Sequence, residues 1–527
     1  MYTENELLLS LEKTESTRGE RLTEKKKLLS AEEKTELLKN FHPDYCENNF
    51  ETLKIGVSAG ERVPKELASL LYAEPYVFNL EIDLGNPDIT TDILIIGGGG
   101  AGCAAALAAS DKGVKVTLAT KLRLGDSNTV MAEGGIQAAD RREDSPMAHF
   151  IDTMGGGGFC NDPELVKELV LSGAPTIKWL ESLGVGFDKR ENGDLIENHG
   201  GGTSFKRMHC AKDYTGLEIM RVLKNEVLTR DIEILEYTSA VEILTDGKTA
   251  VGAVLFNILT DKPLVVKSKC VITATGGAGR LYYGGFPTSN HYGATADGMV
   301  MCYRAGAGFV FADSLQYHPT GVAYPDYLKG SLVTEKVRSL GADLVNKNGD
   351  SFINRLDTRD AVCAAVIKEC AEGRGVYDGN IKGVWLDIPE IEIKQGVGTV
   401  EKKLPNMFKM FISAGIDIRK YPVLVYPTLH YQNGGIKIDV NGMTEVNNLY
   451  AAGELAGGIH GRNRLMGNSL LDILVFGRKS GSAAAESCAG INYGILSLNG
   501  VKSYFAELKK TGITENSVSP ELFPEII

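Results

Sequence analysis

Residues 91–110, TDILIIGGGGAGCAAALAAS, join an apolar strand, a glycine turn and an alanine-rich helix. Gly97, Gly99 and Gly102 fill the pattern G-x-G-x-x-G, and a second apolar strand, KVTLAT, follows at 115–120. Glycines at this spacing permit a tight turn, close approach of the backbone to a pyrophosphate, and close packing of helix on strand. The stretch therefore predicts a Rossmann-like α/β domain that binds a dinucleotide.

The second strand of this unit does not end on an acidic residue. Folds of this kind that bind NAD usually carry a carboxylate about 20 residues after the glycines, where it binds the ribose. Here the strand ends at Thr120-Lys121. Recognition of NAD through such a carboxylate is therefore not expected.

A second stretch, 448–477, is expected to complete the same site. Its apolar strand runs into a glycine-punctuated loop that holds Glu454 and Arg464, and a turn at 467–469 opens a long apolar helix. The N-terminus of a helix presents unpaired N–H groups and positive dipole charge to an electron-rich ligand. We expect this helix start and the glycine loop at 97–102 to close over one cofactor.

Length, charge and the N-terminal sequence limit the class of protein. A chain of 527 residues is too long for one core, so two or three domains are expected. The net charge of −12 argues against nucleic acid as a partner, because phosphate neutralisation needs a basic surface. No apolar run reaches the ~18–20 residues of a membrane span, and the start MYTENELLLSLEKTES is not a secretory signal. A cytoplasmic protein is predicted, associated with a membrane only through a partner.

The cysteines and histidines do not form a metal-binding pattern. The nine cysteines are scattered, and none forms a C-x-x-C pair. The eight histidines show no metal-ligand spacing either. This usage predicts a reduced chain with no iron–sulfur or zinc site of its own.

Changes in composition suggest how the chain is divided. We expect an N-terminal extension at 1–90, a first part of the dinucleotide-binding domain at 91–313, an inserted domain at 314–428, a second part of the first domain at 429–485, and a short tail at 486–527. Within the extension, residues 1–40 are rich in Glu, Lys and Leu at near-helical spacing. They are either a solvated helical arm or an arm that docks a partner subunit, and residues 41–90 form a small ordered appendage.

Several longer motifs occur in a set order along the chain. They are GGGGAG (97–102), SNTVMAEGGI (127–136), QYHPTG (316–321), TRD (358–360), LHYQNGGI (429–436) and HGRNRLMGNSLLDILVFGR (460–478). Together they resemble the flavoprotein subunits of the succinate dehydrogenase/fumarate reductase family, which includes soluble fumarate reductases and L-aspartate oxidase. The likeness runs from about Thr91 to Ala485. It implies FAD as cofactor and a fold in which an inserted α+β capping domain closes over a dicarboxylate.

The resemblance also implies which residues contact FAD. They are Gly97, Gly98, Gly99, Gly100, Ala101, Gly102, Thr120, Lys121, Ser127, Asn128, Thr129, Gly134, Gly135, Asp297, Glu454, Arg464, Ser469 and Leu470. Membrane-bound members of the family carry a histidine bonded to the flavin where this chain has Asn128. Asparagine does not form that bond, so non-covalent FAD is expected. In the family, loss of the bond lowers the flavin potential and favours reduction of fumarate over oxidation of succinate.

The chemistry implied by the resemblance needs positive groups on both carboxylates and a proton donor at one carbon. His318 and Thr334 are expected to bind one carboxylate, and His430 and Arg464 the other. Arg359 stands at the position of the proton donor. Glu335 and Arg338 stand where the family places a proton relay, although the following loop departs from the family pattern.

The resemblance therefore implies a fumarate reductase flavoprotein subunit, which converts fumarate into succinate and is able to run in reverse. Three alternatives remain open. The first is an L-aspartate oxidase, for which Glu133 is a possible partner of the substrate ammonium. The second is a dehydrogenase of a substituted succinate, and the third is a flavin electron-relay subunit without a substrate. Because the chain has no cluster cysteines, an iron–sulfur partner subunit is the favoured electron donor.

Overall fold

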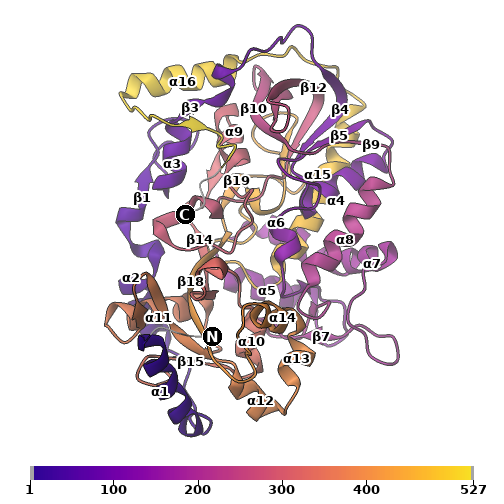
Figure 1. Cartoon of the computed structure of the whole chain (residues 1–527). Coiled ribbons are helices and arrows are strands. Elements are labelled where there is room, and N and C mark those ends of the chain that lie inside the picture. Colours follow the sequence, from indigo (N-terminus) through magenta and orange to yellow (C-terminus); the bar gives the residue numbers. More distant parts are fainter. Residues whose placement is uncertain (1–4, 524–527) are drawn as a thin grey trace.

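The computed structural model describes residues 5–523, and its largest sheet is built around the strand predicted before the glycine loop (Figure 1). That strand, β4 (Ile89–Ile96), pairs in parallel with β5 (Val116–Ala119) on one side and with β12 (Lys262–Thr273) on the other. The full order is β10-β11-β12-β4-β5-β9, and β20 (Leu449–Ala451) also pairs with β12. The end of β4 is an apolar run because parallel strands of this kind are covered on both faces. The predicted Rossmann-like α/β fold is confirmed.

Two helices from opposite ends of the sequence cover this sheet side by side. They are α4 (Gly100–Ser110) and α15 (Asn468–Cys488), and both begin where the sequence predicted a helix start. A Cβ at Gly477 of α15 would lie 2.5 Å from the carbonyl oxygen of Ala101, and one at Gly481 would lie 2.2 Å from that of Ala105. The small residues therefore bring the two helix N-termini to the same edge of the sheet.

The capping domain has a mainly antiparallel sheet of its own. Its order is β14-β18-β17-β15, with β16 beside β17. A separate core of buried residues, among them Trp385 and Phe411, lies between this sheet and its helices. The strands are β14 (Leu315–Val322), β15 (Asp343–Val345), β16 (Val376–Asp378), β17 (Ile381–Asp387) and β18 (Val423–Gln432), and the helices are α10 (Glu335–Leu340), α11 (Arg359–Ala371), α12 (Pro389–Gln395), α13 (Thr399–Lys403) and α14 (Pro405–Ser413).

The N-terminal arm packs on the capping domain instead of standing in solvent. Helix α1 (Asn5–Arg21) lies against β16 and β17, and it buries Leu7 and Leu11 in the capping core. Helix α2 (Ala31–Phe41) lies against α11. Figure 1 shows α1, α2 and α11 grouped at one end of the molecule, away from α16. The interpretation of the arm as solvated is therefore wrong for α1, and residues 1–4 lie outside the described chain.

The C-terminal region is also joined to the rest of the chain. Helix α16 (Asn499–Thr511) is followed by β22 (Val518–Ser519), which pairs with β3 (Glu74–Pro75) from the predicted appendage. The appendage itself contains β1 (Phe50–Thr52), β2 (Arg62–Pro64) and α3 (Lys65–Tyr72), and Leu67 and Leu71 of α3 belong to the core of the first domain. Residues 524–527 of the predicted tail lie outside the described chain.

The remaining elements complete the first domain. They are α5 (Pro146–Gly156), α6 (Pro163–Leu171), α7 (Gly173–Leu183), α8 (Thr215–Leu228), α9 (Asp297–Ala305), β6 (Ile136–Gln137), β7 (Glu197–Asn198), β8 (Met208–His209), β9 (Ile232–Leu235), β10 (Thr238–Asp246), β11 (Thr249–Asn257), β13 (Phe309–Val310), β19 (Gly435–Lys437) and β21 (Ala456–Gly457). Strands β10, β11 and β12 join the first sheet beside β4. Between residues 5 and 523, no helix combines the length and the apolar character needed to cross a membrane.

Candidate active site

A cavity of about 470 Å³ extends from the glycine loop to the capping domain. Gly102 and Arg338 are the predicted site residues that do not line it. Gly102 lies behind the loop, where a Cβ would meet the carbonyl oxygen of Gly97 at 1.8 Å. The predicted residues that do line the cavity are Gly97, Gly98, Gly99, Gly100, Ala101, Thr120, Lys121, Ser127, Asn128, Thr129, Gly134, Gly135, Asp297, His318, Thr334, Glu335, Arg359, His430, Glu454, Arg464, Ser469 and Leu470.

The glycine loop presents bare backbone to one end of the cavity. Gly97 has a φ of +117°, which favours glycine, and a Cβ there would lie 2.2 Å from the carbonyl oxygen of Ala274. A Cβ at Gly98 would lie 2.9 Å from the Thr120 side chain. The N-terminus of α4 follows directly. Backbone amides at a helix start fit the pyrophosphate of a dinucleotide such as FAD.

Lys121 joins three segments at this end of the cavity. Its ammonium group donates to the carboxylate of Asp297 and to the hydroxyl of Thr295, both at 3.0 Å. It also donates to the carbonyl oxygen of Glu521 at 2.6 Å. The C-terminal region is therefore bonded directly to Lys121, which also holds Asp297, so it helps to fix two of the predicted cofactor contacts.

Asn128, at the position where the resemblance implies a flavin-linking histidine in membrane-bound relatives, is held by its whole amide group. Its Nδ2 donates to Asn290 Oδ1 at 2.7 Å and to Glu454 Oε2 at 3.0 Å. Its Oδ1 accepts from the backbone N–H of His291 at 2.5 Å. The other oxygen of Glu454 accepts from the backbone N–H of Gln432 at 3.0 Å. Burial nevertheless raises the pKa of Glu454. The expected contact of Glu454 with a ribose hydroxyl stays a prediction.

Arg359 and Arg464 come together at the capping end of the cavity through a shared acceptor. Gln316 Oε1, on β14, accepts from Arg359 Nη1 at 3.0 Å and from Arg464 Nη2 at 2.8 Å. Arg464 also donates to the hydroxyl of Ser469 at 3.0 Å, and its guanidinium stacks 4.4 Å from the ring centre of Tyr431. Burial, with the charge of Arg359 second, lowers the pKa of Arg464 to about 10. The two guanidiniums are thus fixed side by side.

His318 lies at the same end of the cavity, and one of its hydrogen bonds identifies which ring nitrogen carries the proton. The backbone N–H of Thr320 donates to His318 Nδ1 at 3.3 Å, so in the neutral ring the proton is on Nε2. Burial, and after it the charges of Arg359 and His430, lower the pKa of His318 well below its usual range. A neutral His318 is therefore able to donate one hydrogen bond into the cavity.

His430, on β18, has a similar environment. Its Nδ1 lies 2.9 Å from the hydroxyl of Ser289, and its ring centre lies 5.4 Å from that of His318. Burial and the charge of Arg464 lower the pKa of His430 well below its usual range. Both histidines thus offer neutral donors, and the positive charge of the site belongs to arginines.

Helix α10 places the two predicted relay residues one turn apart. Glu335 Oε2 accepts from Arg359 Nε at 2.6 Å and lies 3.6 Å from Arg338 Nη2. Burial opposes ionisation of Glu335, but the charges of Arg359 and Arg338 outweigh it and lower its pKa. Arg338 is buried behind Glu335 and donates to the carbonyl oxygen of Arg355 at 2.6 Å. The three side chains form a continuous ionic row that ends in the cavity.

The N-terminus of α15 is anchored from the side opposite the cavity. Ser469 and Leu470 line the cavity, whereas the side chain of Asn468 turns into the first domain. Its Oδ1 lies 2.8 Å from His149 Nε2, and its Nδ2 donates to Thr153 Oγ1 at 2.9 Å. Burial lowers the pKa of His149 to about 4, so this histidine is a neutral donor.

Two carboxyl groups in another part of the cavity wall form no ion pair with any basic side chain of residues 5–523. Glu133 Oε1 accepts a long hydrogen bond, 3.4 Å, from Asn406, and its Oε2 is buried without a partner. Asp213 accepts from the backbone N–H of Asn406 at 3.0 Å, and its Oδ1 is also buried without a partner. Burial and the charge of Asp213 raise the pKa of Glu133 well above its usual range.

Comparison with known proteins identifies the family. The model of the FAD binding domain family matches residues 92–470. The chain is 41% identical over 406 residues to a fumarate reductase (CoM/CoB) subunit from Methanothermobacter marburgensis, covering 75% of this chain and 72% of that one. It is 35% identical to the L-aspartate oxidase of Clostridium acetobutylicum, covering 75% of this chain and 87% of that one. A quinol fumarate reductase structure from E. coli superposes with a TM-score of 0.72 and 31% identity, covering 80% and 74% of the two chains.

The chain belongs to the fumarate reductase/succinate dehydrogenase flavoprotein family. Its members include FAD-dependent oxidoreductases, so the chain is an enzyme of that class with an FAD-binding domain. The expected resemblance and the fold of an FAD-binding plus a capping domain are confirmed.

Two features of this site were not predicted from the sequence. Gln316 was overlooked although it is two residues from His318 on the same strand, and side chains two apart share one face of a sheet. That spacing could have indicated it. The bond between His149 and Asn468 joins residues far apart in the chain, and no local signal pointed to it.

Proposed function

We propose that the chain is the FAD-dependent flavoprotein subunit of a fumarate reductase, which converts fumarate into succinate. The balance of charge at the capping end of the cavity supports this proposal. Arg338, Arg359 and Arg464 carry three positive charges and Glu335 one negative charge, which leaves two positive charges. A C4 dicarboxylate carries two negative charges, so it would neutralise the site.

The proposed binding mode uses donors of two kinds. His318 and Thr334 hold one carboxylate, with His318 donating from Nε2. His430 and Arg464 hold the other carboxylate. The arginine bond is charge-assisted and is the stronger of these contacts. The surrounding groups are buried, which strengthens each electrostatic contact because water is excluded.

The proposed chemistry divides a hydride and a proton between the two alkene carbons. When bound, FAD supplies the hydride. Arg359 gives a proton to the neighbouring carbon. Arg338 then gives a proton to the Glu335 carboxylate, Glu335 passes it to Arg359, and Arg338 regains a proton from water. Arginine is a weak acid in water, with a pKa above about 12, so the step depends on close contact with the substrate carbon. The 2.6 Å bond from Arg359 to Glu335 supports this assignment.

We further propose that FAD binds without a covalent bond, because Asn128 offers no ring nitrogen to the flavin and its amide is engaged with Asn290, His291 and Glu454.

We also propose that the electron donor is an iron–sulfur partner protein. The relative from Methanothermobacter marburgensis is named as one subunit of its reductase, and the nine cysteines of this chain are scattered. Co-purification of the flavoprotein with a partner that contains iron and acid-labile sulfide would support an iron–sulfur electron donor. Full activity of the isolated chain with NADH would contradict it.

A steady-state assay tests the main proposal. Under anaerobic conditions, the purified chain with FAD should oxidise a reduced viologen dye only when fumarate is present. Because the dye gives one electron and fumarate takes two, one succinate should be released for every two dye molecules oxidised. Arg359→Ala should retain FAD and lose almost all turnover. An Arg359→Ala variant with turnover close to that of the wild type would contradict the assignment of the proton donor.

A second candidate is the oxidation of an amino-substituted dicarboxylate such as L-aspartate. The carboxyl groups of Glu133 and Asp213 favour it, because burial raises the pKa of each and an ammonium group bound there would lower both pKa values again. Aspartate-dependent reduction of the flavin, lost in Glu133→Gln, would support this candidate. Fumarate reduction that is unchanged in Glu133→Gln, without any reaction with aspartate, would exclude it.

A further inference from the structure

The N-terminal arm reaches the segments that carry the proposed proton donor and relay. The arm precedes residues 92–470, which the family model matches, so the FAD-binding domain model does not include it. Two groups of contacts connect it to the capping domain. One involves α1 and the end of β17, and the other involves the residues between α1 and α2 and the loop before α11.

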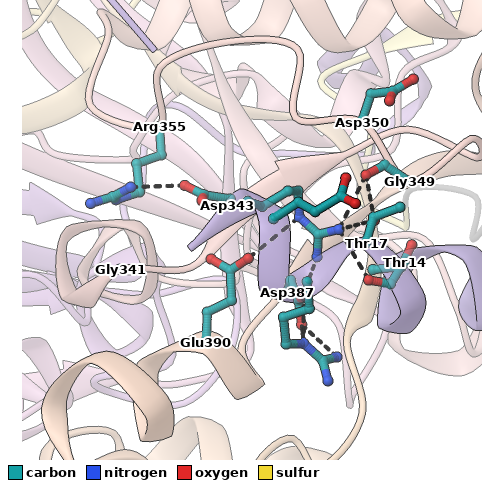
Figure 2. Close-up of polar contacts among 12 residues, drawn as sticks. Thr14, Thr17, Gly341, Asp343, Gly349, Asp350, Arg355, Asp387 and Glu390 are labelled. Atoms are coloured by element: carbon teal, nitrogen blue, oxygen red, sulfur yellow. Dashed lines mark hydrogen bonds and ion pairs between the residues drawn. The ribbon is translucent and has the colours of Figure 1, made fainter. Parts of the chain in front are cut away.

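The first group surrounds a cluster of buried carboxylates. Asp387, the last residue of β17, accepts from Arg18 at 2.9 Å and also from Arg21. Arg21 Nε lies 3.4 Å from Glu390 at the start of α12. Figure 2 shows Glu390, Asp387 and Asp343 grouped together beside Thr14 and Thr17 of α1. The acidic side chains are almost completely buried, so the arginines of α1 supply the charge that they need.

This cluster continues toward α10. Asp343 is the cross-strand neighbour of Asp387, and like charges directly opposite each other are destabilising. Lys394 lies beside this pair: it donates to Glu390 at 2.8 Å and to Asp343 at 3.3 Å. Lys394 also donates to the carbonyl oxygen of Gly341 at 2.8 Å, directly after α10 ends. The C-terminal end of the helix that carries Glu335 and Arg338 is thereby fixed to the cluster.

A second route leads from the same cluster to Arg338. Asp343 Oδ1 accepts from Arg355 Nη1 at 2.8 Å, a contact visible in Figure 2. The carbonyl oxygen of Arg355 then accepts from Arg338 Nη1 at 2.6 Å. Arg338 lies against Glu335, the partner of Arg359. The two hydrogen bonds of this route are charge-assisted, which makes them stronger and more directional than neutral bonds. The last contact, between Arg338 and Glu335, is an ion pair at 3.6 Å.

The second group of contacts holds the loop that leads to Arg359. Asp357 has a fully buried carboxylate, which accepts from the backbone N–H of Leu29 at 2.8 Å and pairs with Lys34 at 2.7 Å. Asn354 donates to the carbonyl oxygen of Lys26 at 2.7 Å. Helix α11 begins at Arg359, two residues after Asp357. The arm therefore contacts the loop immediately before the proposed proton donor.

We propose that the N-terminal arm is a positioning element that fixes Arg359 and its relay in the geometry needed for proton transfer. Arg18 and Arg21 act through the carboxylate cluster of Asp387, Glu390 and Asp343, which Lys394 joins to the end of α10. The segment 26–34 acts through Asp357. The reaction-specific part of this inference rests on the proposed function. The mechanical part, that the arm orders α10 and the start of α11, does not depend on the substrate.

Two sets of variants test the inference on the full chain with FAD. Arg18→Met with Arg21→Met removes the charges that α1 gives to Asp387, and Asp357→Asn removes the ion pair with Lys34. Lys13→Met, on the exposed side of α1, is the matched control. In the test variants, kcat for fumarate should fall about 10- to 100-fold, because small misplacements of a catalytic group have costs of this size. The KM for fumarate and the rate at which dithionite reduces the bound flavin should change less than about twofold.

Hydrogen exchange provides the readout that is independent of substrate. Exchange should accelerate in residues 335–343 and 357–363 of the test variants and stay unchanged in β4, whereas Lys13→Met should match the wild type. If the wild type does not reduce fumarate, the proposed function fails while the exchange result still decides the role of the arm. Unchanged exchange in both segments, equal acceleration throughout the protein, or local acceleration with an unaltered kcat would each overturn the inference.

Discussion

Gln316→Met is the substitution that most directly probes the pairing of the two cavity arginines. It keeps the length of the side chain and removes the oxygen that accepts from Arg359 and Arg464. A hydrogen bond to a charged group contributes about 1.5–3 kcal/mol. If one such bond to Arg359 is lost in the transition state, kcat should fall roughly 10- to 100-fold, since each 1.36 kcal/mol is about tenfold in rate.

Gln432→Met is the matched control for this substitution. Gln432 is as deeply buried as Gln316, at 2% against 3% exposed. Like that of Gln316, its amide donates to backbone carbonyls, here of Ala312 and Ser314, but its oxygen accepts from neither arginine. Both variants should lose stability to a similar degree, and only Gln316→Met should lose turnover. The assay is anaerobic fumarate reduction alongside urea unfolding. Equal losses of kcat in the two variants would refute the role of Gln316.

Two further predictions follow from the buried groups. Burial lowers the pKa of His149 to about 4 from a usual value of 6.5. The stability that the neutral histidine contributes is therefore complete above pH 6.5 and is lost as the pH falls toward 4. The loss amounts to at most about 3 kcal/mol. His149→Gln should therefore flatten the fall in the free energy of unfolding over that range in urea titrations, and an unchanged slope would contradict this role of the histidine. Acid precipitation of the protein should release FAD into the supernatant if, as proposed, Asn128 forms no bond to the flavin. Flavin that stays in the washed pellet and is released by proteolysis only as a flavin-peptide would show a covalent link.

The parts of the fold that depend on local sequence were predictable. The glycine loop after β4 and the helix start at 467–469 carry their own signals, because glycine spacing and a switch to an apolar helix are visible within about 20 residues. The two helices, α4 and α15, begin where expected. The predicted cavity residues also lie together, apart from Gly102 and Arg338, and most of them belong to the ordered motifs.

The parts that depend on contacts between distant residues were not predictable. The pair Arg21 and Asp387 and the pair Lys121 and Glu521 each join segments more than 300 residues apart, and neither has a distinctive local pattern. The leucines of the arm have the spacing of an amphipathic helix. This spacing predicts that one face of the helix is buried, but it does not identify the surface that buries it. The structure shows that the capping core covers it.

The most direct test of the proposed activity is a single anaerobic half-reaction. The bound flavin is reduced chemically, fumarate is added, and the return of oxidised flavin absorbance is followed, with L-aspartate and oxaloacetate as controls. We predict rapid reoxidation by fumarate in the wild type and slow reoxidation in Arg359→Ala with FAD still bound. A folded wild-type protein whose reduced flavin is not reoxidised by fumarate would contradict the proposed activity.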